Sequence, residues 1–486
     1  MLTSKGTLHT VGVLNGQQIL YTAPGTDHLQ TLQFPAGYLS SVTVPYHEPT
    51  IAIRQFSAGR SHILGLADSG RMWSWSVVQS PGLQIKFANV EIREAPSQGS
   101  TAISSLYGRV KQVVAGWSCS SAYIYGTGIV LWEPVHRGRN DDEADTMLVL
   151  ENFEVPKTRY QRIKGATRES EQDRALGEEV GVVLNYIILE NFVVFVTDIG
   201  KVFCGHLGSK NKVDDVLELR ALRNDKASPM DVQGSFRRFA IFKNGEVITI
   251  DQDYLDACWS SRDTNPEQTD VEGLKMIPAL QQNDVISVAF GDYHFLALHS
   301  TGRITTYGTE LQSCGALGLG CDGNSHGQLR GLTYEAFNHN ASLLPQAYTQ
   351  GRQVWFRPQQ REWLKFLMDG GKDLEEAKER MATFQSDRIV QGEVSEWIEQ
   401  EGRQWDKDKG EDGLGAYFAL RVSAAGWHSG AVVMVNDEVA SKPETYDWRN
   451  QSFPRLKLSD GREMEGTVAF DDWREGRAEW QLDVQL

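Results

Sequence analysis

The sequence contains few cysteines, and their spacing matches no metal site. The five cysteines of this 486-residue chain are odd in number and form no CxxC pair: Cys119, Cys204, Cys258, Cys314 and Cys321. A zinc site needs closely paired cysteine or histidine ligands, so none is predicted. Thiols without a disulfide framework are typical of reducing compartments. We therefore expect a cytoplasmic or nuclear protein with no metal and no cofactor.

The sequence also lacks a long apolar run. Its best stretch, 182–196, is broken by Asn185, Glu190 and Asn191, and the N-terminus does not resemble a signal peptide. A membrane-spanning helix needs about 20 apolar residues. No membrane partner is therefore predicted.

The motifs of common catalytic sites are missing as well. There is no P-loop, HExxH or GxSxG segment, and the run from Gly315 to Gly320 has no lysine beside its glycines. A P-loop needs that lysine, and the other two motifs supply a metal site or a nucleophile. We expect no catalytic residues, so the protein is predicted not to be an enzyme.

Basic residues are in the minority. The 64 Asp and Glu residues outnumber the 48 Lys and Arg residues, which gives a formal net charge of −16. A negative field of this size repels phosphate backbones and anionic lipid. Nucleic acid is therefore not expected as a partner.

The chain does contain a strand-turn-strand motif that recurs along its length. A glycine is followed three residues later by a histidine, and then by an apolar run, a turn glycine and an aromatic residue. Two copies share the same offsets: Gly59, His62, Gly70 and Trp75 in the first, and Gly291, His294, Gly302 and Tyr307 in the second. Because the histidine recurs at a fixed place, we interpret it as a buried hydrogen-bonding group and not as a catalytic base.

Fainter copies fit the same register. They comprise Gly116, Cys119 and Trp132; Gly234, Arg237 and Gly245; Gly426 and Ser429 as a front half; Gly200 within 182–205; and Gly6 in an N-terminal back half. Turn glycines supply positive φ between two strands. Their spacing, roughly 45 to 70 residues, is typical of propeller blades. The sequence predicts an all-β fold, a β-propeller of six or seven blades with a helical insertion in its C-terminal third.

These residues resemble the repeat of the regulator-of-chromosome-condensation superfamily. Three segments are also similar to the fungal SCF-associated-factor proteins: LTSKGTLHTVGVLNGQ at 2–17, GDYHFLALHSTGRITTYG at 291–308 and FPRLKLSDG at 453–461. Members of that family carry an F-box before the propeller. The resemblance implies a non-catalytic receptor that binds a protein substrate for ubiquitin-dependent degradation. A Skp-type adaptor and a cullin would be held through the F-box.

The F-box itself is expected to be absent from this chain, because nothing before Gly6 could hold one. Two explanations stay open for the N-terminal half-repeat. The chain starts inside a longer gene product, or this half-repeat pairs with the C-terminal half-repeat around Gly426 and closes the ring.

The repeat is interrupted by three inserts, at about 134–180, 251–283 and 310–419, within a predicted propeller of residues 1–440. Residues 441–486 are predicted to pack on the propeller or complete a blade. The first insert is strongly charged, and much of it is predicted to be mobile. The third has apolar residues at helical spacing, so its helices either pack on the propeller or present a groove to a partner.

Rim loops are where propellers bind partners, and aromatic and arginine side chains are the usual anchors. The predicted partner-binding residues are Arg139, Trp363 and Trp397. Guanine-nucleotide exchange on a small Ran-like GTPase is the alternative that the superfamily resemblance implies. A third hypothesis is ultraviolet sensing by Trp117 and Trp427. Packing in the core of the ring is the favoured interpretation of these two residues.

Overall fold

The computed structural model describes the chain in segments. The described residues are 2–3, 6–10, 30–35, 52–77, 80–94, 106–135, 146–162, 170–226, 228–269, 271–277, 280–281, 284–311, 315–318, 332–334, 343–354, 356 and 413–441. The chain divides into two compact units: Met1–Asn244 with Ile250–Leu274, and Gly245–Thr249 with Lys275–Leu486.

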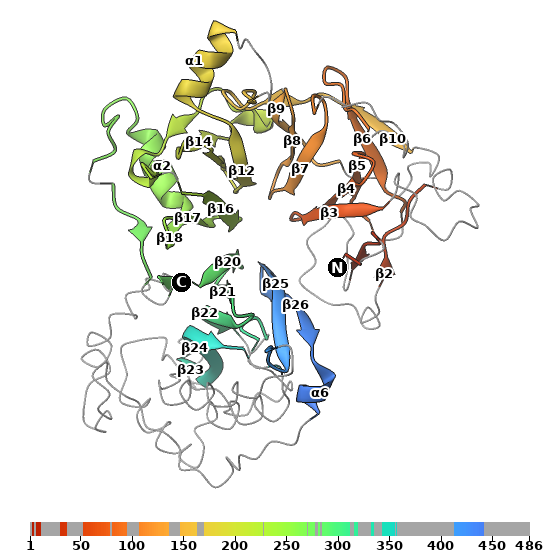
Figure 1. The fold of residues 1–486 in the computed structure, drawn as a ribbon, viewed down its shortest axis with the longest axis vertical. Helices are drawn as coiled ribbons and strands as arrows, with labels where there is room; N and C mark the ends of the chain where they lie inside the picture. Colours follow the sequence, from red (N-terminus) through yellow and green to blue (C-terminus); the bar gives the residue numbers. More distant parts are fainter. Residues whose placement is uncertain are drawn as a thin grey trace. The chain divides into compact units, whose positions relative to one another are not determined.

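The first unit is built from sheets that follow one another along the chain (Figure 1). Its N-terminal pair of strands is β1 (His9–Thr10) and β2 (Gln30–Thr31). The next sheet has the order β10-β6-β5-β4-β3 and contains β3 (Ile53–Ala58), β4 (Ile63–Ala67), β5 (Met72–Trp75), β6 (Leu83–Phe87) and β10 (Met147–Leu150). The third has the order β11-β9-β8-β7 and contains β7 (Val110–Ala115), β8 (Ser120–Ile124), β9 (Gly128–Trp132) and β11 (Phe153–Glu154).

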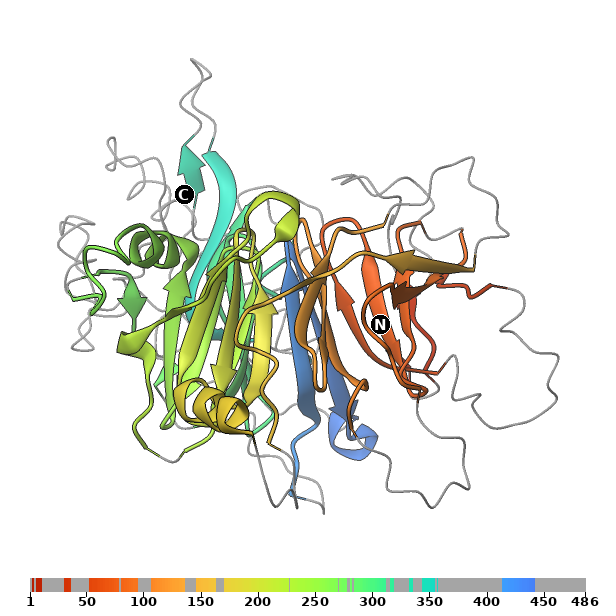
Figure 2. The ribbon, with the colours of Figure 1, turned by 90° about the horizontal axis from the view of Figure 1, so that it is seen from above.

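Two further sheets continue the pattern. One contains β12 (Val183–Ile188), β13 (Phe192–Thr197), β14 (Val202–His206) and β15 (Leu217–Glu218), with the short helices η1 (Ser209–Asn211) and η2 (Arg220–Leu222). The other contains β16 (Met230–Ser235), β17 (Arg238–Lys243), β18 (Glu246–Asp251) and β19 (Leu274–Lys275), and the division between the units falls within β18 and β19. The helices α1 (Glu171–Glu179) and α2 (Gln252–Ser260) lie at opposite ends of the strands (Figure 2).

The second unit holds two more sheets. The order β20-β21-β22-β24-β23 comprises β20 (Val285–Phe290), β21 (His294–His299), β22 (Ile304–Leu311), β23 (Leu332–Tyr334) and β24 (Leu343–Gln353). A two-stranded sheet and a short helix follow: β25 (Tyr417–Ala425), β26 (His428–Val435) and α6 (Asp437–Ala440).

This architecture confirms the predicted all-β propeller class. The sheets β12–β15 and β16–β19 are each an up-and-down run of four consecutive strands, which is how a propeller blade is built. The blade number, six or seven, stays a prediction. The predicted helices of the C-terminal third and the segment 442–486 lie outside the described residues.

The core of the first unit lies between its sheets. Trp73 and Trp75 of β5 are both buried, and the ring of Phe34 meets them edge-on at centroid distances of 5.0 and 5.4 Å. The β12–β15 sheet packs against the neighbouring sheet in a second cluster that includes Tyr123 and Phe195. Alternating apolar residues on both faces of the strands therefore bury each sheet between its neighbours.

The first insert contains more regular structure than its charge predicted. Its described residues form β10, β11 and α1. Strand β10 returns to the first sheet and pairs in parallel with β6, Leu148 opposite Ile85 and Leu150 opposite Phe87. The apolar run at 147–150 explains the difference, because its inward side chains pack into the core of that sheet.

Two faint copies of the repeat are displaced by one residue from the predicted register. In β16 and β17 the hairpin pairs Ser235 with Arg238, one position after the predicted Gly234 and Arg237. In β25 and β26 it pairs Ala425 with His428, so that Gly426 lies within the turn. The polar and small residues at these turns fit either register locally, and strand pairing decides between them.

Candidate protein-binding surface

The glycine–histidine motif forms the tight turn between the first two strands of a sheet. The Gly59 amide donates to His62 O at 2.9 Å, and a Cβ on Gly59 would lie only 2.8 Å from the His62 ring. His62 Nε2 then shares a 2.8 Å hydrogen bond with Ser120 Oγ of the next sheet, and both side chains are buried. The glycine is therefore needed because the imidazole packs directly on it.

The same arrangement occurs in the second unit. The Gly291 amide donates to His294 O, and His294 Nε2 lies 2.8 Å from Ser429 Oγ. At the corresponding turn of β12 and β13, Leu189 and Phe192 take the two places and keep the backbone hydrogen bond. Each histidine thus joins one sheet to its neighbour, in a position that suits a structural group.

A β-bulge recurs near the start of the first strand of five sheets. The register shifts fall at Ile53/Gln55, Val110/Gln112, Val183/Asn185, Val285/Ser287 and Ala419/Arg421. Two side chains at these bulges donate hydrogen bonds to the first strand of the following sheet. Arg54 Nη2 donates to Val110 O at 2.9 Å, and Lys111 Nζ donates to Leu184 O at 2.6 Å. Burial lowers the pKa of Lys111. Two of the bulges therefore present a side chain to the first strand of the next sheet.

Three residues that follow bulges, Gln55, Gln112 and Asn185, form a polar row across the first unit together with Asp231 of β16. Gln112 Nε2 donates to Asn185 Oδ1 at 2.9 Å, and Asn185 Nδ2 donates to Asp231 Oδ1 at 2.6 Å and Val232 O at 3.0 Å. Gln55 bonds more weakly to the backbone of Val113, at 3.5 and 3.3 Å. The sequence analysis missed this row, although each member stands four residues before its hairpin turn.

The two kinds of turn lie at opposite ends of the strands, because consecutive strands are antiparallel. We call the end with the turns at 59–62, 116–119, 189–192 and 235–238 the hairpin-tip end. The end with the turns at Gly70, Gly200 and Gly245 is the glycine-turn end, and all three of these glycines have positive φ. The two ends carry different side chains.

At the hairpin-tip end, three turns converge on one tryptophan. The Arg60 guanidinium lies over the Trp117 ring, 4.0 Å from its centroid, and the Phe236 ring lies 4.3 Å from it at 34°. Trp117 and Phe236 are half-buried and Arg60 is exposed. The Glu190 amide donates to Phe236 O at 2.6 Å, which ties a fourth turn to the stack.

Helix α2 extends this surface. Asn191 N donates to Gln252 Oε1 at 3.0 Å, and Gln252 N donates to Arg237 O at 2.7 Å, so the helix begins beside two hairpin turns. At its other end the Trp259 ring stacks on His206 at 5.9 Å and 26°, and the Arg262 guanidinium lies 4.8 Å from the Trp259 centroid. We call these residues the tip surface: Arg60, Trp117, Ser118, Glu190, His206, Lys210, Asn211, Phe236, Arg237, Trp259 and Arg262.

Three non-glycine residues of the tip surface have a left-handed backbone, and three others among the described residues, Lys157, Asn244 and Gln268, lie elsewhere. Lys210, Asn211 and Phe236 have φ values of 58°, 57° and 55°. Asn211 Nδ2 donates to Ser118 O at 2.9 Å, and Phe236 stacks on Trp117. A left-handed backbone is unfavourable for a bulky side chain, and such strain is found at binding sites. The strained positions therefore flank the turn that carries Trp117.

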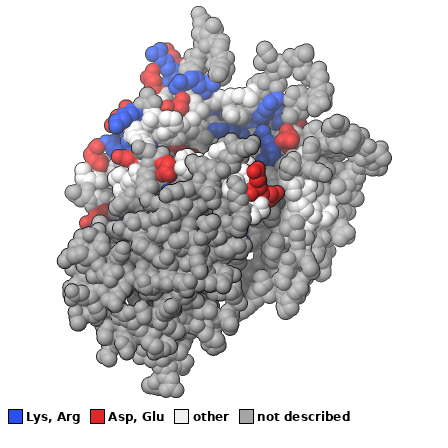
Figure 3. Space-filling view, turned by 60° about the horizontal axis from the view of Figure 1, so that its bottom comes forward, with Lys and Arg blue, Asp and Glu red and all other residues white. Residues whose placement is uncertain are grey.

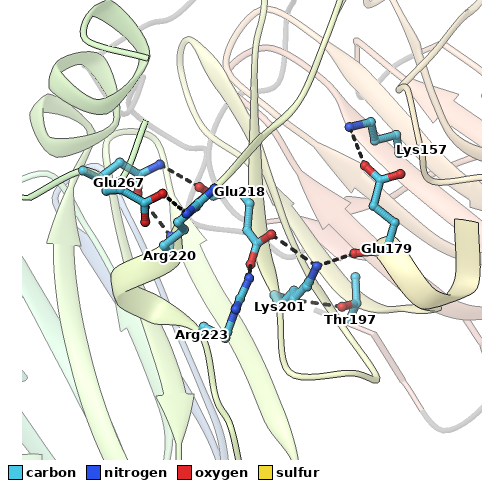
Figure 4. Close-up of polar contacts among 9 residues, drawn as sticks. Lys157, Glu179, Thr197, Lys201, Glu218, Arg220, Arg223 and Glu267 are labelled. Atoms are coloured by element: carbon cyan, nitrogen blue, oxygen red, sulfur yellow. Dashed lines mark hydrogen bonds and ion pairs between the residues drawn. The ribbon is translucent and has the colours of Figure 1, made fainter. Parts of the chain in front are cut away.

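The glycine-turn end carries a network of ion pairs (Figure 4). Glu218 lies 3.3 Å from Lys201 Nζ and also accepts from Arg223 Nε at 2.9 Å. Lys201 Nζ also donates to Glu179 O at the end of α1, while Glu179 pairs with Lys157 at 3.0 Å. Hydrogen bonding to Glu218 raises the pKa of Arg223. These charges are matched within the protein and hold α1 to the sheet.

One face of the molecule is shown as a space-filling view in Figure 3. Over its described residues, basic and acidic side chains lie beside one another. The excess negative charge of the sequence is therefore not gathered into one patch on the described part of that face.

The thiols suit a structural role. Cys119, Cys204 and Cys258 are buried, and burial raises the pKa of Cys119 to about 12. A thiol with such a pKa is protonated at neutral pH and is a poor nucleophile. Within the described ranges, no three metal-ligating side chains come together, and no helix is long and apolar enough to cross a membrane.

The predicted partner-binding residues Arg139, Trp363 and Trp397 all lie outside the described residues. Trp117, for which ring-core packing was favoured, is instead half-buried on the tip surface. A tryptophan directly after a motif glycine was the signal for this site.

No protein-family model matches the chain. Over 266 residues the chain is 26% identical to SCF-associated factor 1 of Saccharomyces cerevisiae, covering 54% of this chain and 34% of that protein. Over 279 residues it is 25% identical to the F-box protein pof9 of Schizosaccharomyces pombe, covering 56% of this chain and 48% of that protein. The chain thus matches between a third and a half of the length of these curated relatives. They confirm the resemblance to the fungal SCF-associated-factor proteins.

Among solved structures, the chain is similar to yeast RCC1 bound to Kap60, at 13% identity and a TM-score of 0.39, over 90% of this chain and 94% of that chain. It is also similar to human WBSCR16, at 14% identity and a TM-score of 0.27, over 53% of this chain and 62% of that chain.

Proposed function

We propose that this chain is the substrate-recognition propeller of an SCF-type ubiquitin ligase that acts in the cytoplasm or nucleus. The observation that carries the proposal is the sequence similarity to two fungal proteins named as an SCF-associated factor and an F-box protein. The described residues contribute a surface with aromatic and arginine side chains, which are the residue types that anchor protein partners.

The mechanism is proximity. An F-box in the complete gene product would hold a Skp-type adaptor and, through it, a cullin, while the propeller holds a substrate protein. Linking the two binding events raises the local concentration of substrate lysines near the conjugating enzyme. The chain itself performs binding and no chemical step.

The test is to tag the complete protein at its own gene and purify it from cells. Immunoblots for the Skp-type adaptor and the cullin should both be positive, at levels similar to those of another tagged F-box protein. Absence of both, while the reference F-box protein captures them, would contradict the proposal. Substrate candidates should accumulate when the gene is deleted.

A further inference from the structure

We infer that residues 454–458 of the C-terminal segment form a third strand on the open edge of β26. This contact is separate from the binding of substrate and adaptor under the proposed function. It completes the last sheet from within the chain and closes that edge of the sheet to a strand from a partner.

The second strand of a sheet is buried elsewhere in the protein but exposed in β26. Every residue of β8, β13 and β21 is buried. Each of these strands pairs with a first strand on one side and a third strand on the other. No residue of β26 is buried, and among the described residues β26 pairs with β25 alone. The exposure of β26 therefore goes together with its open edge.

The sheet of β25 and β26 also exposes apolar side chains. Val432, Met434 and Val435 of β26 are 57%, 43% and 51% exposed, and Leu420 of β25 is 50% exposed. Val433, in contrast, packs on the core cluster that this sheet shares with β21. Covering apolar surface is favourable by about 25 cal/mol per Å², so a strand beside β26 would stabilise the sheet.

The open edge of β26 lacks the residues that keep natural edge strands from pairing. From His428 to Val435 the strand contains no lysine, no proline and no acidic residue. Natural edge strands carry such residues, are very short, or are covered by another part of the chain. Because β26 is eight residues long and without these residues, we expect it to be covered.

The chain that follows β26 differs from the chain that follows other second strands. After β21, the turn at Gly302 leads directly into the third strand, β22. After β26, the helix α6 begins at its N-cap Asn436 in place of such a turn. Residues 442–486 then follow; they lie outside the described residues and belong to the same compact unit as β26. Residues 442–453 are enough to reverse the chain direction, because antiparallel strands can be joined by a hairpin of about two residues.

The sequence of the C-terminal segment contains the pattern that this edge requires. Leu456 and Leu458 alternate with basic residues, which is the period of a half-buried strand, and Gly461 follows as a turn residue. A strand at this place would set the two leucines beside Val432 and Met434, and apolar cross-strand pairs stabilise a sheet. It would also supply partners for the backbone N–H and C=O groups on the open side of β26.

Disulfide cross-linking in the complete protein tests the contact. Val432→Cys is combined in turn with single cysteine substitutions across residues 455–459, in a chain that carries Cys314→Ser and Cys321→Ser. A disulfide forms readily only between residues whose Cα atoms lie within about 7 Å. We expect at least one pair to form an intramolecular disulfide under mild oxidation, seen on non-reducing gels and by mass spectrometry of the linked peptides. No cross-link at any of these positions would overturn the inference.

The same gels identify other occupants of the edge. A disulfide-linked dimer of the Val432→Cys protein, without one for Leu106→Cys at a similar exposure of 49%, would show that a second copy covers β26. A cross-link from Val432→Cys to His9→Cys, in place of the C-terminal positions, would show that the N-terminal half-repeat covers it. Either result would overturn the inference.

Hydrogen exchange measures the effect on β26 itself. In the wild type, the amides of β26 should be protected on the side away from β25 as well as on the side facing it. Leu458→Gln should speed the exchange of these outer amides about tenfold or more, whereas the matched control Lys457→Gln should not. The amides of β21 should stay protected in both variants, which shows that the unit remains folded. Fast exchange of the outer amides in the wild type, or equal exchange in the two variants, would overturn the inference.

Discussion

The two ends of the blades in the first unit solve the problem of a tight turn in different ways. At the glycine-turn end, Gly70 and Gly200 take up positive φ, and nearby charges form ion pairs such as Lys201 with Glu218. At the hairpin-tip end, Phe236 takes up positive φ and its ring packs against Trp117. At Gly70 and Gly200 the first end has the residue type that best suits the backbone, although Asn244 beside Gly245 also takes up positive φ. The second keeps side chains where the backbone disfavours them.

This difference indicates where selection for folding and selection for binding act. Glycine in a left-handed turn is the least strained choice, and matched ion pairs leave little for a partner to bind. The aromatic side chain of Phe236 is retained at a strained position against a conformational cost. The tip end is therefore where a loss of side chains should affect binding more than stability, and the glycine-turn end is where the reverse should hold.

The largest effect is expected from Gly200→Ala at the glycine-turn end. Gly200 has φ +81°, and an added Cβ would lie 2.1 Å from Asn224 O, so strain and a backbone clash add together. We expect a loss of about 3 kcal/mol in the free energy of unfolding. Chemical denaturation measures it. Gly208→Ala, where the nearest atom is 3.3 Å away and φ is ordinary, is the control and should lose well under that amount.

The next effect tests the polar row that lies between the two ends. Asn185→Leu removes the donor to Asp231 and Val232 and the acceptor for Gln112. Leaving these partly buried groups without a partner should cost about 2 to 3 kcal/mol. Gln55→Leu, whose hydrogen bonds are long, should cost about 1 kcal/mol. Equal losses in the two variants would show that the row does not act through its hydrogen bonds.

The smallest effect on stability is expected from Phe236→Gly at the tip end. Glycine relieves a left-handed conformation worth about 1 to 2 kcal/mol, while the lost contact with Trp117 is worth about 0.5 to 1.5 kcal/mol. The melting temperature should therefore change little, while the amount of substrate protein that the complete protein captures falls. Asn244→Gly, at φ +55° beside Gly245, is the control and should change neither. A large loss of stability in Phe236→Gly would make Phe236 a packing residue and remove the contrast between the ends.

Strong local signals made part of the fold predictable from the sequence. Gly59 with His62 and Gly291 with His294 are found in the same turn and hydrogen-bonding arrangement, because an imidazole packed on the chain leaves room only for glycine. The turn glycine Gly302 likewise has positive φ, as the repeat predicted. Positions with one sterically acceptable residue type are the ones that a sequence reveals.

The features that the sequence did not predict depend on contacts between residues that are distant in the chain. The turn at Leu189 and Phe192 keeps the geometry of the repeat without its residues, so no motif could reveal it. The one-residue displacement at Ser235 and Arg238 follows from pairing across the whole hairpin. The stack on Trp117 joins turns that are far apart in sequence, and only the folded chain brings Arg60 and Phe236 to it.

Strand β10 has a consequence for the order in which the chain can assemble during synthesis. It completes the outer edge of the first sheet, yet the ribosome makes it only after β7, β8 and β9 of the following sheet. The outer edge of the first sheet, at β6, therefore stays unpaired while the strands of the next sheet are synthesised. The first sheet can be completed only after the next sheet has left the ribosome. A nascent chain stopped before Met147 should therefore be a better chaperone client than one stopped after Glu154.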